Sequence, residues 1–153
     1  MPFYAQKRQF NWIDIGQVAD YWAVLQRVLK GEISDLKMPG TEVKPGVWVG
    51  LNTRIDWDNV TIEGPVYIDS GVCIKAGAKI IGPAWISNSS HICRNATLIQ
   101  SITLPYTRIS AEMTFDQTIV SPKYYFDHKN GVTYYLGDEN TRLRWGDARR
   151  HCP

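Results

Sequence analysis

The fold is decided by the stretch Ile62-Glu-Gly-Pro-Val-Tyr-Ile68-Asp-Ser-Gly-Val-Cys-Ile74-Lys-Ala-Gly-Ala-Lys-Ile80-Ile-Gly-Pro-Ala-Trp-Ile86, in which isoleucine recurs at every sixth position. The register extends in both directions, with one interval of seven between Ile55 and Ile62. Its aliphatic positions are Val43, Val49, Ile55, Ile62, Ile68, Ile74, Ile80, Ile86, Ile92, Leu98 and Leu104. An amphipathic helix has a period of about 3.6 and an alternating strand one of about 2. The six-residue period therefore predicts a repeat fold.

Turn-forming residues stand at the third position after most of these aliphatics, and small or β-branched residues follow them. The turn-forming positions are Gly46, Asn52, Asp58, Pro65, Gly71, Gly77, Pro83, Ser89 and Asn95. Because such residues favour tight turns, each hexapeptide is predicted to be a short strand followed by a corner. Three hexapeptides then close a triangular coil of about 18 residues with the aliphatics inside. The predicted interior stacks are Ile62 with Ile80 and Leu98, and Ile68 with Ile86 and Leu104.

From Val43 to about Phe115 the pattern resembles the hexapeptide-repeat family, in which an aliphatic is followed by glycine or an acidic residue and later by a small residue. That family folds as a left-handed parallel β-helix, an exception to the usual right-handed crossover. The handedness follows from the resemblance, since a period alone does not fix it. The expected fold class is mainly β: a left-handed β-helix with one N-terminal amphipathic helix and a C-terminal hairpin cap.

The seven-residue interval contains one extra residue within Asp56-Trp-Asp-Asn-Val-Thr61. An insertion of this kind is expected to bulge at a corner and to leave the register of the following coils unchanged. We expect Trp57 to lie on the bulge.

An amphipathic helix is predicted before the repeats, within residues 18–30. Its apolar stripe consists of Val18, Tyr21, Trp22, Leu25, Val28 and Leu29. Gly31 is positioned to end the helix. Residues 1–31 form the first predicted segment, residues 32–42 form a linker, and the β-helix occupies residues 43–120.

The last predicted segment, residues 121–153, contains a cap and a tail. Asn130-Gly131 stands between aromatic, strand-forming residues and predicts a β-hairpin. Because the last coil of a solenoid exposes its core and its strand edges, we expect the hairpin to cover it. The basic segment 142–150 is predicted to be a solvated tail.

Aromatic residues precede three of the interior aliphatics at intervals close to one coil: Trp48, Tyr67 and Trp85. They are predicted to stack on one outer face, and we call these three residues the aromatic ladder. An exposed apolar surface of this size usually has something packed against it. The favoured covering is the N-terminal helix of the same chain; a subunit interface and a ligand surface are the alternatives.

The composition argues against polyanionic partners and against a membrane. Seventeen basic and fifteen acidic residues give a net charge of +2, and we expect no nucleic-acid binding. The sequence shows neither an apolar run of about 20 residues nor a signal-peptide core. Three cysteines without a CxxC pair favour unpaired thiols. The expected location is the cytoplasm.

The segment Trp12-Ile-Asp14-Ile-Gly16, followed by a helix and then by hexapeptides, resembles the end of the catalytic domain of sugar-1-phosphate nucleotidyltransferases. This family includes mannose-1-phosphate guanylyltransferases and glucose-1-phosphate uridylyl- or thymidylyltransferases. Residues from Asn95 to Val120 resemble the closing repeats of such enzymes. The resemblance implies that Asp14 helps to bind Mg²⁺, which suits a carboxylate ligand. Gln17 stands where the family has threonine.

The family's glycine-rich nucleotide loop does not occur in the 153 residues. We therefore expect the chain to be the C-terminal scaffold, oligomerisation and regulatory portion of such an enzyme, inactive in isolation, with residues 1–31 left from the catalytic domain. The complete enzyme would make GDP-mannose or UDP- or dTDP-glucose for surface polysaccharide synthesis. The expected partners are further copies of the chain, through the β-helix, and the missing catalytic domain.

Two other functions share this fold. A hexapeptide acyltransferase using acyl-CoA would need a general base, for which His91 is the candidate within the coils. A trimeric zinc enzyme would need three histidines around the metal, and His91, His128 and His151 are too far apart in the repeat register to favour it. An exposed histidine without a partner is more often a surface residue.

Overall fold

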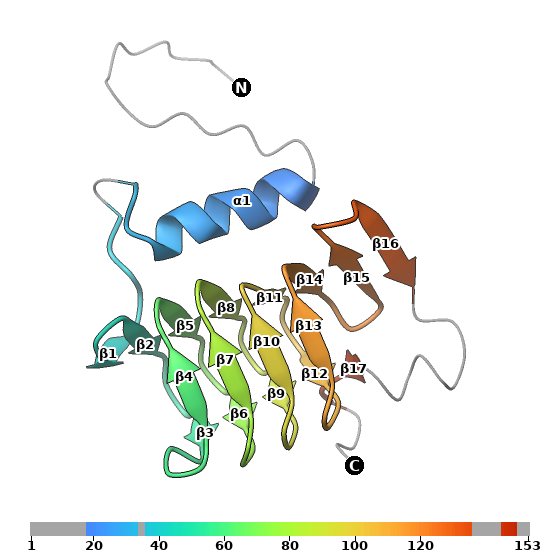
Figure 1. Cartoon of the computed structure of the whole chain (residues 1–153). Helices are drawn as coiled ribbons and strands as arrows, with labels where there is room; N and C mark the ends of the chain where they lie inside the picture. The colour runs from blue at the N-terminus through green and yellow to red at the C-terminus, as the bar shows by residue number, and fades with distance from the viewer. Residues whose placement is uncertain (1–17, 34–35, 136–144, 150–153) are drawn as a thin grey trace, which may run out of the picture.

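The structure, a computed structural model, describes residues 18–33, 36–135 and 145–149. In this part of the chain the predicted fold class is confirmed: one helix accompanies a β-solenoid of about four turns, in agreement with a left-handed β-helix (Figure 1). The coils stack so that successive strands on each side pair in parallel. Three sheets form the sides of the solenoid.

The eight-stranded sheet has the order β1 (Thr41–Lys44), β2 (Val47–Val49), β5 (Val66–Ile68), β8 (Ala84–Ile86), β11 (Ile102–Thr103), β14 (Thr118–Val120), β15 (Tyr124–Asp127) and β16 (Val132–Tyr135). The five-stranded sheet has the order β17 (Trp145–Asp147), β12 (Thr107–Ile109), β9 (His91–Ile92), β6 (Cys73–Ile74) and β3 (Arg54–Ile55). The four-stranded sheet has the order β13 (Thr114–Asp116), β10 (Thr97–Ile99), β7 (Lys79–Ile81) and β4 (Thr61–Glu63).

Each sheet contributes one interior stack to the core. In the four-stranded sheet the stack is Ile62, Ile80, Leu98 and Phe115, so the first predicted stack is confirmed. In the five-stranded sheet it is Ile55, Ile74, Ile92, Ile109 and Trp145. The isoleucines of the middle coils are 0 to 1% exposed, as expected for side chains that point into a solenoid.

The second predicted stack is wrong at Leu104. Ile68 and Ile86 are in register as expected, but Thr103 aligns with Ile86 and with Val120. The coil is one residue shorter than predicted because two residues, Gln100 and Ser101, form the corner between Ile99 and Ile102, whereas three residues separate Ile81 from Trp85 in the preceding coil. Thr103 is fully buried, and its hydroxyl accepts a hydrogen bond from the backbone nitrogen of Ser87 at 3.2 Å.

The predicted start of the repeat at Val43 is also wrong. Val43 lies in β1, which pairs antiparallel with β2, and it is 48% exposed. The core begins at Val47 and Val49, which are 1% and 7% exposed. The first six-residue step is therefore a reversal of the chain at the end of the solenoid and not part of a coil.

The extra residue near Trp57 forms a turn, as predicted. The backbone nitrogen of Asn59 donates to the oxygen of Asp56 at 3.0 Å, and the coils on both sides keep their register. The Trp57 ring packs against the core, and the Lys44 ammonium lies 5.0 Å from its centre. Trp57 therefore covers the first coil.

The predicted helix is present as α1 (Val18–Leu29). It ends in a Schellman motif: the Gly31 nitrogen donates to Val28 at 3.1 Å and the Glu32 nitrogen to Arg27 at 3.0 Å. Gly31 has a φ of 72°, a conformation that glycine adopts without strain. The helix lies along the stacked coils beside the eight-stranded sheet (Figure 1).

The C-terminal end is closed by more than the predicted hairpin. Strands β15 and β16 form that hairpin, and β15 pairs with the edge of β14. Trp145 in β17 is 0% exposed and packs edge-on against Phe115 and Tyr125. The expectation of a solvated tail is wrong at Trp145–Asp147, because β17 pairs antiparallel with β12.

Two further expectations concern the cysteines and the membrane. Cys73 has a free thiol, as expected, but the expectation is wrong at Cys93, which is disulfide-bonded. Within residues 18–33, 36–135 and 145–149, no helix has the length and apolar character that crossing a membrane requires.

Candidate functional site

The aromatic ladder occupies one outer row of the eight-stranded sheet. Trp48 aligns with Tyr67 and Tyr67 with Trp85; the rings of Tyr67 and Trp85 are 4.4 Å apart and inclined at 58°. The row continues through Ile102 and Ile119. The structure thus brings together three residues that the sequence places 18 or 19 positions apart.

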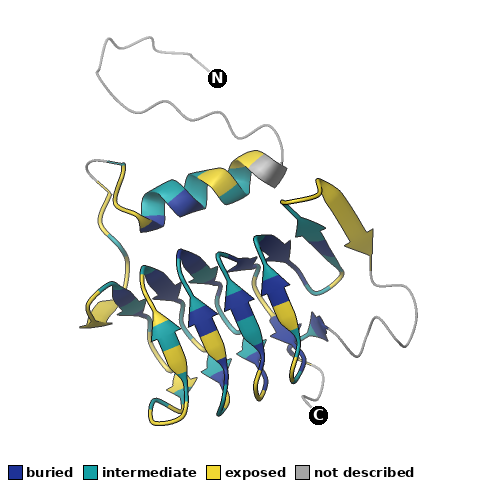
Figure 2. Cartoon of the chain, in the orientation of Figure 1, coloured by how far each residue is buried: buried dark blue, intermediate teal, exposed yellow. Residues whose placement is uncertain are grey.

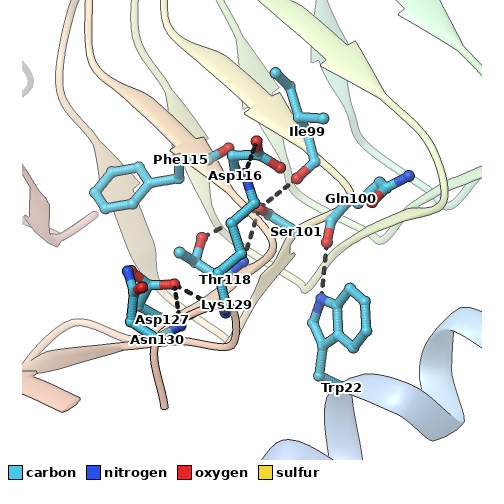
Figure 3. A network of polar contacts seen from close by, with 10 residues as sticks. All are labelled: Trp22, Ile99, Gln100, Ser101, Phe115, Asp116, Thr118, Asp127, Lys129 and Asn130. Atoms are coloured by element: carbon cyan, nitrogen blue, oxygen red, sulfur yellow. Dashed lines mark hydrogen bonds and ion pairs between the residues drawn. The ribbon is translucent and has the colours of Figure 1, made fainter. Parts of the chain in front are cut away.

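Helix α1 is attached to this face by two hydrogen bonds to corner carbonyls. The side-chain nitrogen of Gln26 donates to the backbone oxygen of Pro83 at 3.0 Å. The indole nitrogen of Trp22 donates to the backbone oxygen of Gln100 at 2.8 Å (Figure 3). The Trp22 ring also stacks on His128, with centroids 4.0 Å apart. The polar atoms of the helix therefore fix its position on the solenoid, in addition to its apolar stripe.

The outer row differs in burial from one position to the next. Tyr67 is 5% exposed, whereas Trp48 and Trp85 are half-buried. Ile102 and Ile119 are fully buried. Three alternatives were considered for what covers the aromatic ladder. In the structure, helix α1 of the same chain lies on this sheet. A subunit interface at Trp48, Tyr67 and Trp85 stays a prediction.

Tyr67 also has a polar role that its place in the repeat does not reveal. Its hydroxyl donates to Asp69 at 3.0 Å, and the same carboxylate oxygen accepts from the Ser70 nitrogen at 2.7 Å. Burial, followed by the hydrogen bond and the charge of Asp69, raises the pKa of Tyr67 to about 12. An aspartate two residues after an outward-facing tyrosine is the sequence signal for this pair.

A polar network joins the last coil to the hairpin (Figure 3). The Ser101 hydroxyl donates to the oxygen of Ile99 at 2.8 Å and lies 3.1 Å from the hydroxyl of Thr118. On the hairpin, Lys129 forms an ion pair with Asp116. The serine contacts join neighbouring coils, and the Lys129–Asp116 ion pair fixes the β15–β16 turn against the end of β13.

His91 lies on a different side of the solenoid, in the five-stranded sheet. It aligns with Cys73 on one side and with Arg108 on the other. Burial, then the charges of Lys75 and Arg54, lowers the pKa of His91. The charges that act on it are thus cationic, whereas a catalytic histidine is usually oriented by a carboxylate. Its role as an acyltransferase base stays a prediction that calorimetry with coenzyme A tests.

The metal ligand expected from the family resemblance, Asp14, lies outside the described residues. Within residues 18–33, 36–135 and 145–149, no group of three or more histidine, cysteine, aspartate or glutamate residues is placed to hold a metal ion.

Comparison with known proteins relates the chain to part of a longer protein. No protein-family model matches the chain. Over 127 residues the chain is 42% identical to a UTP–glucose-1-phosphate uridylyltransferase of Synechocystis sp.. The matched region is 83% of this chain and 33% of the relative, so the chain spans about a third of that protein's length.

Proposed function

Since the chain matches the C-terminal part of a sugar-1-phosphate nucleotidyltransferase with a hexapeptide-repeat domain, we propose that it is the scaffold and assembly portion of an enzyme that makes nucleotide-sugars. The relative's name favours UTP and glucose 1-phosphate as the substrates of the complete enzyme, and so UDP-glucose as its product, over GDP-mannose. We propose that this product is made in the cytoplasm. We also propose that it supplies the synthesis of surface polysaccharide.

The observation that carries the scaffold role is the attachment of α1. The helix follows directly on residues 1–17, which carry the segment that resembles the end of the catalytic domain. Gln26 and Trp22 fix the helix to two successive coils, at Pro83 and Gln100. A domain preceding the helix would therefore be joined to the solenoid through an element that is itself anchored.

The division of labour in the complete enzyme follows from the same arrangement. Nucleotide binding and phosphoryl chemistry belong to the preceding domain, where Asp14 would contribute a carboxylate to Mg²⁺. A carboxylate oxygen is the type of ligand that this hard cation prefers, and the bound ion would stabilise charge on the phosphates. The solenoid contributes position, stability and assembly surfaces.

The chain alone tests the first part of the proposal. Incubated with Mg²⁺, UTP and glucose 1-phosphate, it is expected to form no UDP-glucose above background. Sustained turnover by the isolated chain would contradict the assignment of a scaffold.

A chimera tests the second part. In the Synechocystis uridylyltransferase the matched third is replaced by this chain, and UDP-glucose formation is expected to persist. A matched chimera carrying Trp22→Ala and Gln26→Ala, which loses both hydrogen bonds of α1 to the corners, is expected to lose activity or thermal stability. Full function of the double variant would show that the helix attachment does not position the domain.

A further inference from the structure

The two edges of the eight-stranded sheet are both antiparallel strands, and both are exposed. At one end β1 pairs with β2, and at the other β16 pairs with β15. Every residue of β1 and of β16 is exposed, as Figure 2 shows at the two ends of the solenoid. An exposed edge strand presents unpaired backbone donors and acceptors to other chains. The two edges differ in how they are protected.

Strand β1 carries the usual protection against edge pairing. It contains two charged residues, Glu42 and Lys44, and the register shifts between them. The Glu42 carboxylate also accepts a hydrogen bond from the Gly46 nitrogen at 3.2 Å, which holds a negative charge beside the strand. Charges and irregularities at an edge discourage the addition of another strand.

Strand β16 lacks this protection. Its sequence is Val132-Thr-Tyr-Tyr135, without charge or proline, and its pairing with β15 is regular. Val132 is 41% exposed, Tyr134 43% and Tyr135 72%. Within the described residues, β15 is the strand that pairs with β16, so one edge of β16 has no partner strand there. The composition is that of a strand suited to pairing.

The hairpin that carries this edge is held firmly. The rings of Tyr134 and Tyr125 stack at 4.7 Å with an angle of 21°, and Tyr125 belongs to the core. The ion pair of Lys129 with Asp116 fixes the turn to β13. An edge that is already ordered loses little conformational entropy when another strand binds.

We propose that β16 is an association edge at which two copies of the chain pair antiparallel about a two-fold axis. The two eight-stranded sheets would then form one continuous sheet. This inference deepens the assembly role in the proposed function and rests on it.

A second copy is the occupant that the charges favour. Residues 132–135 carry no formal charge at neutral pH, so an antiparallel alignment of the strand with itself opposes no like charges. The Lys129 charge near the turn is already paired with Asp116. Pairing of β16 with β16 closes after two copies, whereas pairing of β16 with β1 would continue into a filament and would meet the charges and the bulge of β1.

Sedimentation velocity over a range of concentrations tests the proposal on the full chain. The expected result is a reversible dimer. Thr133→Lys puts a lysine near the middle of β16, where the two copies would face each other, and it should raise the dimer dissociation constant about tenfold or more, or 1.4 kcal/mol. Val43→Lys puts the same charge on β1, the opposite exposed edge, and should leave the dimer unchanged.

Amide hydrogen exchange separates this dimer from other assemblies. The amides of residues 132–135 should exchange more slowly at high than at low concentration in the wild-type chain and in Val43→Lys, but not in Thr133→Lys. A dimer that survives Thr133→Lys without protection of residues 132–135 would contradict the pairing of two copies at β16. It would leave the proposed assembly role of the chain in place. A strict monomer at all concentrations would overturn both, while the chimera's activity would still report separately on the enzyme assignment.

Discussion

The indole nitrogen of Trp22 donates a hydrogen bond of 2.8 Å to the backbone oxygen of Gln100, 78 residues further along the chain. Gln100 is the corner at which the coil is one residue shorter than the repeat predicts. One of the two hydrogen bonds that attach the helix is therefore made at a shortened corner, and the other is made at Pro83, in the preceding coil.

Trp22→Phe is expected to lower the free energy of unfolding by about 1 to 2 kcal/mol. The variant keeps an aromatic ring on His128 but removes the donor, and it leaves the Gln100 carbonyl without this partner. Urea denaturation measures the change. Ala23→Ser, at an exposed position on the same helix, is the control; an equal loss in both would show that the hydrogen bond contributes nothing.

Trp145→Ala is expected to cost about 3 to 5 kcal/mol, as for a large side chain removed from a core. Trp145 is fully buried and packs edge-on against Phe115 and Tyr125, so its loss leaves a cavity at the end of the solenoid. Leu51→Ala is the control at the other end, where Leu51 is 76% exposed. A cost below about 1 kcal/mol for Trp145→Ala would mean that β17 is a loosely attached tail.

Gly82→Ala should destabilise the fold far more than Gly31→Ala. A Cβ at Gly82 would lie 2.2 Å from the backbone oxygen of Pro65 in the preceding coil, and backbone atoms cannot rotate away. A Cβ at Gly31 meets nothing within 4 Å, so that variant is expected to cost about 1 kcal/mol for its positive φ. Thermal unfolding of both variants compares them, and similar losses would contradict the close packing of the corners.

The stability contributed by His91 should fall in acid. Because burial and the charges of Lys75 and Arg54 lower its pKa in the folded state, the unfolded chain binds the proton more tightly. The contribution is thus present above the unfolded pKa of about 6.5 and is lost as pH decreases through the folded pKa. Titration of the His91 ring by NMR measures this value, and Lys75→Gln should raise it whereas Lys30→Gln should not. A pKa at or above the unfolded value would contradict the described surroundings.

Tyr67→Phe should reduce the loss of stability at alkaline pH. The folded pKa of Tyr67 is raised to about 12, so the hydrogen bond to Asp69 stabilises the fold below the unfolded pKa of about 10 and is lost as pH rises through about 12. Absorbance of tyrosinate during an alkaline titration follows the change. If the wild-type chain already forms one more tyrosinate than the variant at the ordinary tyrosine pKa of about 10, Tyr67 is not shielded as described.

The interior of the solenoid was predictable wherever an aliphatic marks the core, as at Ile62, Ile80 and Leu98. The prediction failed at Leu104 because Thr103, held by hydrogen bonds to Ser87 and Ser90, is buried in place of an aliphatic residue. A period read from apolar residues cannot detect a buried hydroxyl whose partners come from another coil.

The ends of the fold were harder to predict for a related reason. Val43 fits the period, yet it lies on an antiparallel strand outside the core. Trp145 stands among arginines and resembles a tail, yet a long-range pairing with β12 buries it. Neither pairing leaves a local signal in the sequence. The family-based expectation for Asp14 concerns a residue beyond those that the structure describes.

Helix α1 is attached along the stacked coils, so its length corresponds to the height of the coils beside it. Its 12 residues extend about 18 Å, which matches roughly four spacings of 4.8 Å between neighbouring strands. A relative that gained a coil between these two corners would displace one of the corner carbonyls from the helix. The length of the helix and the number of coils beside it are therefore expected to change together among relatives.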